Sequence, residues 1–256
     1  MIALHDLCKS YPGSARDAVR AVNLSVADGE FLVLIGESGC GKTTTLNMIN
    51  RLIEPSAGRI EIDGEDALAI EVVSLRRRMG FVFQAVGLFP HMTVAENIGI
   101  TPKLLGWERP RIAARVDELL GLVRLEPEVF RGRMAGALSG GQAQRVGLAR
   151  ALAAEPKIML MDEPFGALDP LTRDDLATDY RRIHDQLGLT TVLVTHDMTE
   201  ALILADRIAV MRDGELVQVG KPNELLNRPA DDFVRHLVET PKRRARLLAD
   251  AMQAGA

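Results

Sequence analysis

The sequence has few aromatic residues and few cysteines. Only 4% of its 256 residues are Phe, Trp or Tyr, and its two cysteines are Cys8 and Cys40. So few aromatic rings argue against a stacking platform for single-stranded nucleic acid. The formal net charge of -4 argues against the basic face that general nucleic-acid binding requires. The two cysteines stand far apart without metal-ligand spacing, so they need form neither a disulfide nor a site. We therefore expect no nucleic-acid partner.

Long apolar runs are also absent. No stretch approaches the roughly 18 apolar residues that span a bilayer. The first six residues lack the basic and apolar regions of a signal peptide. We expect a chain that stays in the cytosol, soluble when isolated and at most peripheral to a membrane. Its 256 residues, 47% of them hydrophobic, allow one large domain or two small ones with an aliphatic core.

Short runs rich in Val, Ile and Leu alternate with helical patterns, which is typical of an α/β protein with a largely parallel, buried sheet. The strands expected in this core are 31–35, 59–62, 80–83, 158–161, 191–195 and 207–211. The extended segments 2–8 and 19–26 indicate an antiparallel edge on that core. A hairpin at 212–220 and short helices are expected to follow the last core strand.

No convincing strand is present between residues 94 and 153, where the periodicities are helical. One amphipathic pattern covers 111–120 and is expected to end at Gly121, and another covers 142–153. We interpret this part of the chain as a helical insertion in the α/β core.

A glycine-rich segment at 36–43 has the spacing G-x-x-x-x-G-K-[ST]. It follows an apolar strand and opens a helical pattern, so backbone amides and a helix N-terminus can cradle a phosphate chain. We expect Lys42 to reach the β- and γ-phosphates and Thr43 to be a ligand of Mg²⁺. The negative charge of Glu37 suits this loop only if its side chain points outward. The residues predicted to bind nucleotide here are Gly36, Ser38, Gly39, Cys40, Gly41, Lys42, Thr43 and Thr44.

The apolar strand 158–161 is followed by two acids, Asp162 and Glu163. Carboxylates at the C-terminal end of a strand lie where α/β sheets place their ligands. Alone, such a strand is mostly structural, but the glycine-rich loop makes a functional interpretation strong. We expect Asp162 to hold Mg²⁺, usually through water, and Glu163 to orient or deprotonate an attacking water molecule.

A third motif, LSGGQ at 138–142, also opens a helical pattern, so the Ser139 hydroxyl and the amides of Gly140 and Gly141 form a second anion site. LSGGQ between a phosphate-binding loop and a strand ending in Asp-Glu resembles the nucleotide-binding domain of ATP-binding cassette (ABC) proteins. The resemblance covers residues 1 to about 240. It implies a P-loop NTPase fold and ATP with Mg²⁺ as cofactors.

The resemblance also implies roles for single residues. Tyr11 matches the aromatic residue that stacks on adenine, and Gln84 matches the glutamine that approaches Mg²⁺ and the water molecule. Asp169 matches the D-loop aspartate, in a segment where Gly166 replaces the Ser of many relatives, and His196 matches the histidine that contacts the γ-phosphate. The candidate catalytic residues are therefore Glu163, His196 and Gln84, and the candidate metal ligands are Thr43, Gln84 and Asp162.

ABC domains of this kind dimerise head to tail. The resemblance therefore implies that ATP on the P-loop of one copy is contacted by residues of the second copy, namely Ser139, Gly140, Gly141 and Gln142. It further implies transmembrane permease subunits as partners, an extracytoplasmic solute-binding protein as an indirect partner, and a peripheral position on the cytoplasmic face of the inner or plasma membrane.

Three functions compete within the family: a transporter ATPase, a soluble ATPase of DNA repair or translation, and a module that binds nucleotide without turnover. No heptad run separates Gln84 from Leu138, as the coiled coil of repair-type members would. Translation-type members carry two cassettes, whereas one is present here. Glu163 and His196 argue against a module without turnover. These observations favour the ATP-hydrolysing subunit of a transporter.

Two segments, 49–55 (INRLIEP) and 87–93 (GLFPHMT), look like ATPases that import glycine betaine, choline, carnitine and related quaternary-amine osmoprotectants. An importer of polar amino acids or another small solute is the alternative, because the solute does not touch this subunit. We expect a single ABC domain at 1–240, with a helical subdomain at about 94–153. A short basic tail at 241–256 and no CBS domains complete the expected organisation.

Overall fold

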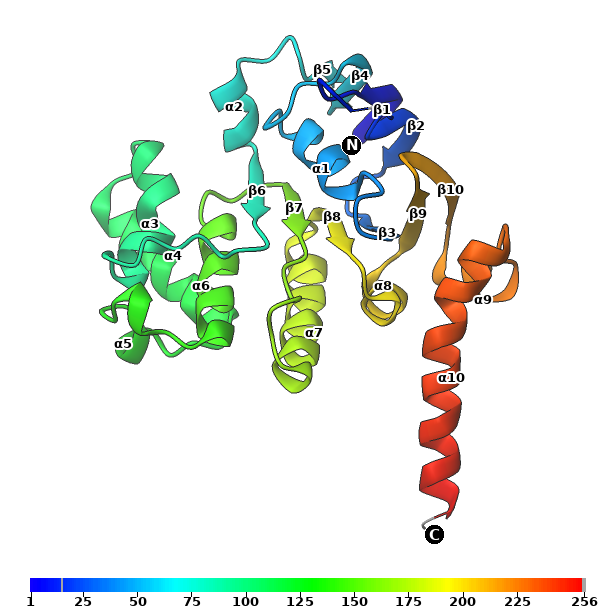
Figure 1. The fold of residues 1–256 in the computed structure, drawn as a ribbon. Helices are drawn as coiled ribbons and strands as arrows, with labels where there is room; N and C mark the ends of the chain where they lie inside the picture. Colours follow the sequence, from blue (N-terminus) through cyan, green and yellow to red (C-terminus); the bar gives the residue numbers. More distant parts are fainter. Residues whose placement is uncertain (15, 255–256) are drawn as a thin grey trace.

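Two β-sheets organise the computed structural model, which describes residues 1–14 and 16–254 (Figure 1). The larger sheet contains, in spatial order, β10 (Glu215–Gly220), β9 (Arg207–Arg212), β3 (Phe31–Gly36), β8 (Thr190–Thr195), β7 (Ile158–Asp162) and β6 (Met79–Val82). The smaller sheet contains β2 (Val19–Val26), β1 (Ile2–Lys9), β4 (Ala57–Ile62) and β5 (Glu65–Asp66). From β9 to β6 the larger sheet is parallel, and β10 joins its edge antiparallel to β9.

The central strand β3 is covered on both faces, and all six of its residues are buried. Phe31, Val33 and Ile35 belong to a hydrophobic cluster with helices, whereas Leu32 and Leu34 belong to a second cluster that includes the antiparallel sheet. Successive side chains of a strand point to opposite faces, so the larger sheet is the middle layer of the fold. A strand buried on both faces is an uninterrupted apolar run, which made β3 predictable.

The helices are arranged around these sheets (Figure 1). In chain order they are α1 (Lys42–Ile49), α2 (Val72–Arg77), α3 (Val94–Leu104), α4 (Arg109–Leu122), α5 (Pro127–Phe130), the 3₁₀ helix η1 (Ala135–Ala137), α6 (Gly140–Leu152), α7 (Pro170–Leu187), α8 (Met198–Leu204), α9 (Pro222–Asn227) and α10 (Asp232–Ala254). Helices α3 to α6 are inserted between β6 and β7 and lie together beside the core sheet (Figure 1). In the part of the chain that the structure describes, every helix is too short or too polar to cross a bilayer.

The predicted fold class is confirmed: the core sheet is mostly parallel, the N-terminal strands are antiparallel, and a helical segment is inserted. The antiparallel strands form a sheet of their own. Assigning 59–62 to the parallel core was wrong, because β4 pairs antiparallel with β1. In β4 only Ile60 and Ile62 are buried, which is the alternation of a half-buried strand rather than the continuous run of a core strand.

Two helix predictions were also wrong. Helix α4 continues past Gly121 to Leu122, because an exposed glycine weakens a helix without necessarily ending it. In place of short helices up to the C-terminus, α10 extends from Asp232 to Ala254 with Pro241 inside it. The predicted basic tail falls on this helix as far as residue 254. Residues 255 and 256, and the side chains from 244 onward, lie outside the described part.

Candidate active site

The glycine-rich loop between β3 and α1 lies close to neighbouring backbone. A Cβ on Gly36 would lie 2.1 Å from the carbonyl oxygen of Met211, and one on Gly41 would lie 2.4 Å from that of Ala18. Gly41 has a φ of 105° and is the N-cap of α1. Since glycine has no side chain to cap the first amides of α1, these donors remain available to an anion. The backbone therefore has the form that the motif predicts.

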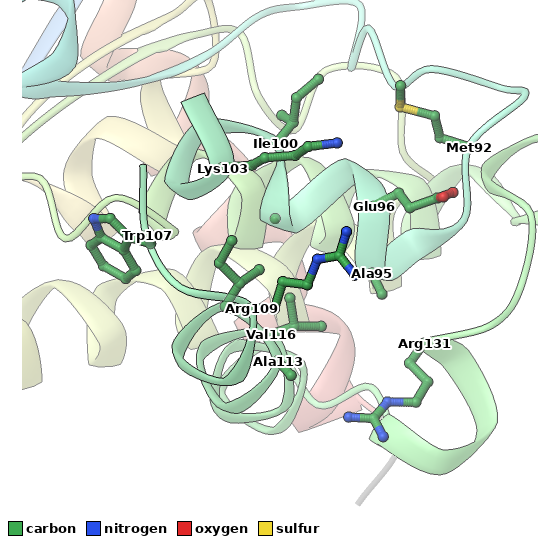
Figure 2. Close-up of a pocket in the computed structure, with 12 residues that line it drawn as sticks. Met92, Ala95, Glu96, Ile100, Lys103, Trp107, Arg109, Ala113, Val116 and Arg131 are labelled. Atoms are coloured by element: carbon green, nitrogen blue, oxygen red, sulfur yellow. The ribbon is translucent and has the colours of Figure 1, made fainter. Parts of the chain in front are cut away.

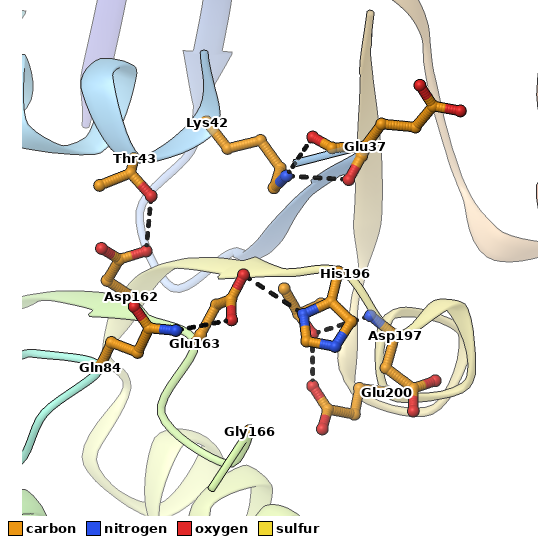
Figure 3. A network of polar contacts seen from close by, with 12 residues as sticks. Glu37, Lys42, Thr43, Gln84, Asp162, Glu163, Gly166, His196, Asp197 and Glu200 are labelled. Carbon is orange, nitrogen blue, oxygen red and sulfur yellow. Dashed lines mark hydrogen bonds and ion pairs between the residues drawn. The ribbon is translucent and has the colours of Figure 1, made fainter. Parts of the chain in front are cut away.

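Lys42 lies buried at the start of α1, with 5% of its surface exposed. Its ammonium donates hydrogen bonds to the carbonyl oxygens of Gly36 and Glu37, both at 2.8 Å, and lies 3.9 Å from Sγ of Cys40. The Glu37 carboxylate points away from this ammonium, as the sequence required (Figure 3). The acceptors of Lys42 are thus neutral carbonyl groups, which charged phosphate oxygens can replace with stronger hydrogen bonds.

Thr43 faces the end of β7. Its hydroxyl donates a hydrogen bond of 2.9 Å to Oδ1 of Asp162. Burial raises the pKa of the Asp162 carboxyl, and the neighbouring Glu163 adds to this, while the Thr43 hydrogen bond and the Lys42 charge oppose it. A hydroxyl and a carboxylate oxygen in contact are hard donors of the kind that Mg²⁺ prefers, and Mg²⁺ usually takes only one or two protein carboxylates beside phosphate oxygens. The residues present therefore fit Mg²⁺.

Glu163 is held between two side chains (Figure 3). Nε2 of Gln84 donates to Oε2 of Glu163 at 3.1 Å, and Nδ1 of His196 lies 3.3 Å from Oε1. The Glu163 amide donates to the carbonyl oxygen of Val194 at 2.9 Å, which fixes the residue against β8. Its φ of 43° lies in the left-handed region that non-glycine residues rarely adopt. Backbone strain of this kind, observed here at a predicted catalytic residue, favours a functional site.

A second layer of polar groups lies behind His196, in residues 195–200, which we call the switch segment. The Thr195 hydroxyl donates to Oε2 of Glu200 at 2.6 Å and accepts a hydrogen bond from the Asp197 amide at 3.1 Å. Glu200 is 8% exposed, and burial raises the pKa of its carboxyl. Arg173 of α7 lies 3.6 Å from Asp197 and 3.8 Å from Glu200.

No role for Glu200 or Arg173 was predicted from the sequence. Helical spacing carries no signal that connects Glu200 to His196, because α8 begins at Met198 and His196 precedes it.

The LSGGQ segment lies in a different place. Ser139 is the N-cap of α6, and in this capping box the Gln142 amide donates to the Ser139 hydroxyl while the Gln142 side chain accepts from the Ser139 amide. The segment borders a cavity of about 490 Å³. Its lining residues are Ser139, Gly140, Gly141, Gln142, Arg145, Ala167, Leu168, Asp169, Thr172 and Asp175. One chain therefore places LSGGQ beside its own D-loop (166–169) and not beside its own Lys42.

The remaining predicted residues occupy varied positions. Asp169 caps α7, and the hydrogen bonds from Thr172 lower the pKa of its carboxyl. Tyr11 lies in the loop after β1 with 39% of its surface exposed, and Nζ of Lys9 is 5.3 Å from its ring centre.

The other predicted residues of the glycine-rich loop differ in exposure. Cys40 is buried, and burial raises the pKa of its thiol. Ser38 and Gly39 are exposed in the loop, and Thr44 is half-buried in α1.

Fold and site together define a P-loop protein of the ATP-binding cassette class. A profile of the family described as "ABC transporter" matches residues 19–166, more than half of the chain, and the chain belongs to this family. The choline transport ATP-binding protein OpuBA of Bacillus subtilis is 54% identical over 238 residues, which cover 93% of this chain and 62% of that protein. The glycine betaine uptake system ATP-binding protein YehX of Escherichia coli is 53% identical over 92% of this chain and 76% of that protein. The chain thus spans less than two thirds of the length of OpuBA.

Solved structures of the cassette MJ0796 have the same fold. A dimeric structure described as a bacterial ABC transporter cassette matches with a TM-score of 0.79 and 35% identity, covering 87% of this chain and 99% of that one. A dimeric post-hydrolysis state of MJ0796, bound to ADP and Pi, matches with a TM-score of 0.77, the same identity and the same coverage.

Proposed function

We propose that this chain is the ATP-hydrolysing subunit of an ABC importer for glycine betaine, choline or related quaternary-amine osmoprotectants. The observation that carries the proposal is the position of Glu163, held by Gln84 and His196 beside the Thr43–Asp162 pair. These groups meet at the C-terminal ends of parallel strands, where α/β sheets bind ligands. The names of the relatives, which are transport ATP-binding proteins, support the same function.

ATP binding is assigned to the loop 36–43. The free amides at the start of α1 and the Lys42 ammonium would bind the phosphate chain, with phosphate oxygens replacing the carbonyl acceptors of Gly36 and Glu37. The exposed ring of Tyr11 is available to stack on the adenine. Dimers of the neighbour MJ0796 contain ADP and Pi, which supports a nucleotide at the corresponding place here.

Mg²⁺ is assigned to the oxygen atoms of Thr43, Asp162 and Gln84. When bound, the ion would neutralise charge that develops on the phosphate oxygens. The protein itself contributes the position of the ligands, since the Thr43 hydroxyl and the Asp162 carboxylate already lie 2.9 Å apart.

Hydrolysis is assigned to Glu163. A carboxylate at this place can accept a proton from the attacking water molecule or orient it. Its two partners keep the carboxylate fixed, because Gln84 binds one oxygen and His196 lies against the other. The His196 side chain is 61% exposed although its Nδ1 faces Glu163, so the ring can also contact a γ-phosphate.

A second copy of the chain is proposed to complete each site. LSGGQ borders a cavity with its own D-loop rather than with its own P-loop. A head-to-tail dimer would place Ser139, Gly140 and Gly141 of one copy against ATP on Lys42 of the other. The dimeric structures of MJ0796 support this arrangement.

The helical insertion is proposed to bind the permease. A cavity of about 660 Å³ lies between α3 and α4, with an apolar floor and charged residues such as Lys103, Arg109 and Arg131 at its rim (Figure 2). This composition suits one amphipathic cytoplasmic helix of a transmembrane subunit. A solute-binding protein would act only indirectly, through the permease. The chain would thus be peripheral, on the cytoplasmic face of the membrane.

The segment 84–92 connects this cavity to the site and is fastened at two points. Arg150 of α6 donates hydrogen bonds of 2.7 Å to the carbonyl oxygens of Val86 and Gly87. The buried Asn97 side chain accepts from the Phe89 amide and donates to its carbonyl oxygen. Because these bonds tie the segment to α3 and α6, a movement of the helices would also displace Gln84 and its partner Glu163.

The solute is tested by uptake in a strain that lacks its own copy of this gene. Labelled glycine betaine, choline and a set of polar amino acids are offered to cells that carry the parent chain or Lys42→Ala. We expect uptake of a quaternary amine with the parent chain and none with Lys42→Ala. Uptake of a polar amino acid or another small solute alone would support the alternative importer, and no dependence on the chain would contradict a role in transport.

A further inference from the structure

Arg173 contacts two segments that each lie against Glu163, the D-loop and the switch segment. It lies on the first turns of α7, with 25% of its side chain exposed. Its Nη2 donates hydrogen bonds to the carbonyl oxygens of Gly166, at 3.3 Å, and Leu168, at 3.2 Å. Both acceptors belong to the D-loop, which is itself attached to Glu163 because the Gly166 amide donates to the Glu163 carbonyl oxygen at 3.2 Å.

The same guanidinium also faces the switch segment. Nη1 lies 3.6 Å from Oδ2 of Asp197, and Nε lies 3.8 Å from Oε1 of Glu200. The other oxygen of Glu200 accepts the Thr195 hydroxyl hydrogen bond, and Thr195 directly precedes His196. A chain of contacts therefore runs from Arg173 through Glu200 and Thr195 to the histidine that touches Glu163.

We infer that Arg173 is a positioning residue for ATP hydrolysis, which fixes the D-loop and the switch segment relative to each other so that His196 and Glu163 keep their contact. This inference rests on the proposed function. Arg173 is suited to the task because a guanidinium presents five donors in a fixed plane and can serve two carbonyl groups and two carboxylates at once.

The pairing with Glu200 is not fully closed. Nε of Arg173 is buried without a hydrogen-bond partner, and a buried unpaired donor carries a free-energy penalty. A movement of under about 1 Å would bring Nε within hydrogen-bond distance of the Glu200 carboxylate. The Nε donor and the Glu200 carboxylate thus favour a closer approach of the two side chains.

The test compares two arginines of the same helix in the purified chain. Arg181 also lies on α7, with 29% exposure, and pairs with Asp185 and Asp206 at 2.9 and 3.0 Å. It also donates to the carbonyl oxygen of Leu204 at 2.8 Å, but this is the C-terminal end of α8, one turn beyond Glu200 and away from His196. We expect Arg173→Gln to lower kcat for ATP hydrolysis by about tenfold to a hundredfold with little change in KM. Arg181→Gln should leave kcat within about twofold of the parent, although we expect its melting temperature to fall by about as much as that of Arg173→Gln.

Arg173→Lys and Glu200→Gln extend the test. Lysine keeps the charge but cannot bind all four acceptors, so the kcat of Arg173→Lys should lie between those of the parent and Arg173→Gln. If Arg173→Gln does not fold, Arg173→Lys still tests the inference. If Arg173 acts through Glu200, the double variant Arg173→Gln with Glu200→Gln should be no slower than the slower single variant within about twofold.

The outcomes separate the inference from the function on which it rests. A parent chain without ATP hydrolysis would contradict the proposed function itself. If the parent is active, three results would overturn the inference alone: a kcat of Arg173→Gln within about twofold of the parent, an effect confined to KM, or fully additive effects in the double variant.

Discussion

The P-loop region and the LSGGQ region differ in how their polar groups are satisfied. Around the P-loop, groups from four separate segments contact one another, as Thr43 does with Asp162 and Glu163 does with Gln84 and His196. In the LSGGQ region, Ser139 and Gln142 satisfy each other within one helical turn. The first region is thus assembled by the tertiary fold, whereas the second is a preformed helix end. In the proposed dimer, these two regions from different copies would be the two halves of one site.

The largest effect is expected from Glu163→Gln, which tests the chemistry of the first region. Loss of the carboxylate should lower ATP hydrolysis by about 10²- to 10⁴-fold, because general-base catalysis is lost, while ATP binding is retained. The bound ATP should then trap a dimer, visible by size-exclusion chromatography with Mg-ATP. Glu65→Gln on the exposed strand β5 is the matched control and should hydrolyse ATP at the parent rate. Hydrolysis by Glu163→Gln at the parent rate would contradict the assignment.

The next effect tests whether the two regions belong to different copies. Ser139→Arg and Lys42→Ala should each abolish hydrolysis when alone. Mixing them should restore part of the activity, since a mixed dimer has one site with an intact Lys42 and an intact Ser139. Hydrolysis is measured against the mixing ratio. Two inactive variants that stay inactive in every mixture would show that the halves do not meet between copies.

A smaller effect is expected at the Thr43–Asp162 contact. Thr43→Ala and Asp162→Asn should each raise the Mg²⁺ concentration needed for half-maximal hydrolysis by about tenfold to a hundredfold. Thr43→Ser keeps the hydroxyl and is the control. An unchanged Mg²⁺ requirement in both variants would remove these residues from the metal site.

Asp162→Asn also has an expected effect on stability. Because burial raises the pKa of the Asp162 carboxyl in the folded chain, this group stabilises the fold below its unfolded pKa of 3.8, and the contribution is lost as the pH rises through the folded pKa. At neutral pH without nucleotide, Asp162→Asn should therefore melt no lower than the parent. Its advantage should shrink as the buffer becomes acidic. A melting temperature below that of the parent at neutral pH would contradict a raised pKa of Asp162 in the folded chain.

The smallest effect is expected for Ser139→Ala, which tests the internal satisfaction of the LSGGQ region. Loss of the N-cap should lower the free energy of unfolding by about 1 kcal/mol. For a chain of this length the melting temperature should fall by about 2 to 4 °C. Ser139→Thr, which keeps a capping hydroxyl, should melt close to the parent. If the alanine variant melts like the parent, the hydroxyl has no structural role in the isolated chain.

The same difference explains what the sequence could predict. A P-loop or a capping box is made of neighbouring residues, so the spacing of Gly36, Gly41 and Lys42, or of Ser139 and Gln142, is visible in the sequence. The contact between His196 and Glu163 depends on the register of β7 beside β8, and only the resemblance to ABC proteins connected the two residues. The strand β4 was misplaced because a short half-buried strand reads much like a core strand when its partners are unknown.

Arg173 and Glu200 were not predicted from the sequence for a related reason. Each lies on a helix surface where a charge is ordinarily solvated, and nothing local distinguishes them from Arg181 or Asp185. Their role depends on how α7 and α8 pack on the same sheet, which is a property of the whole fold. Functional residues that act through other residues are therefore the least visible in a single sequence.

The left-handed backbone of Glu163 has a consequence for laboratory evolution. A non-glycine residue in this conformation is destabilised by roughly 1 kcal/mol or more relative to glycine, yet glycine has no carboxylate. A library screened only for heat resistance would therefore enrich variants with glycine or asparagine at position 163. These variants would be inactive. Screens for robust variants of this chain need ATP turnover as a second criterion, or they will select against the residue that we propose as the catalytic base.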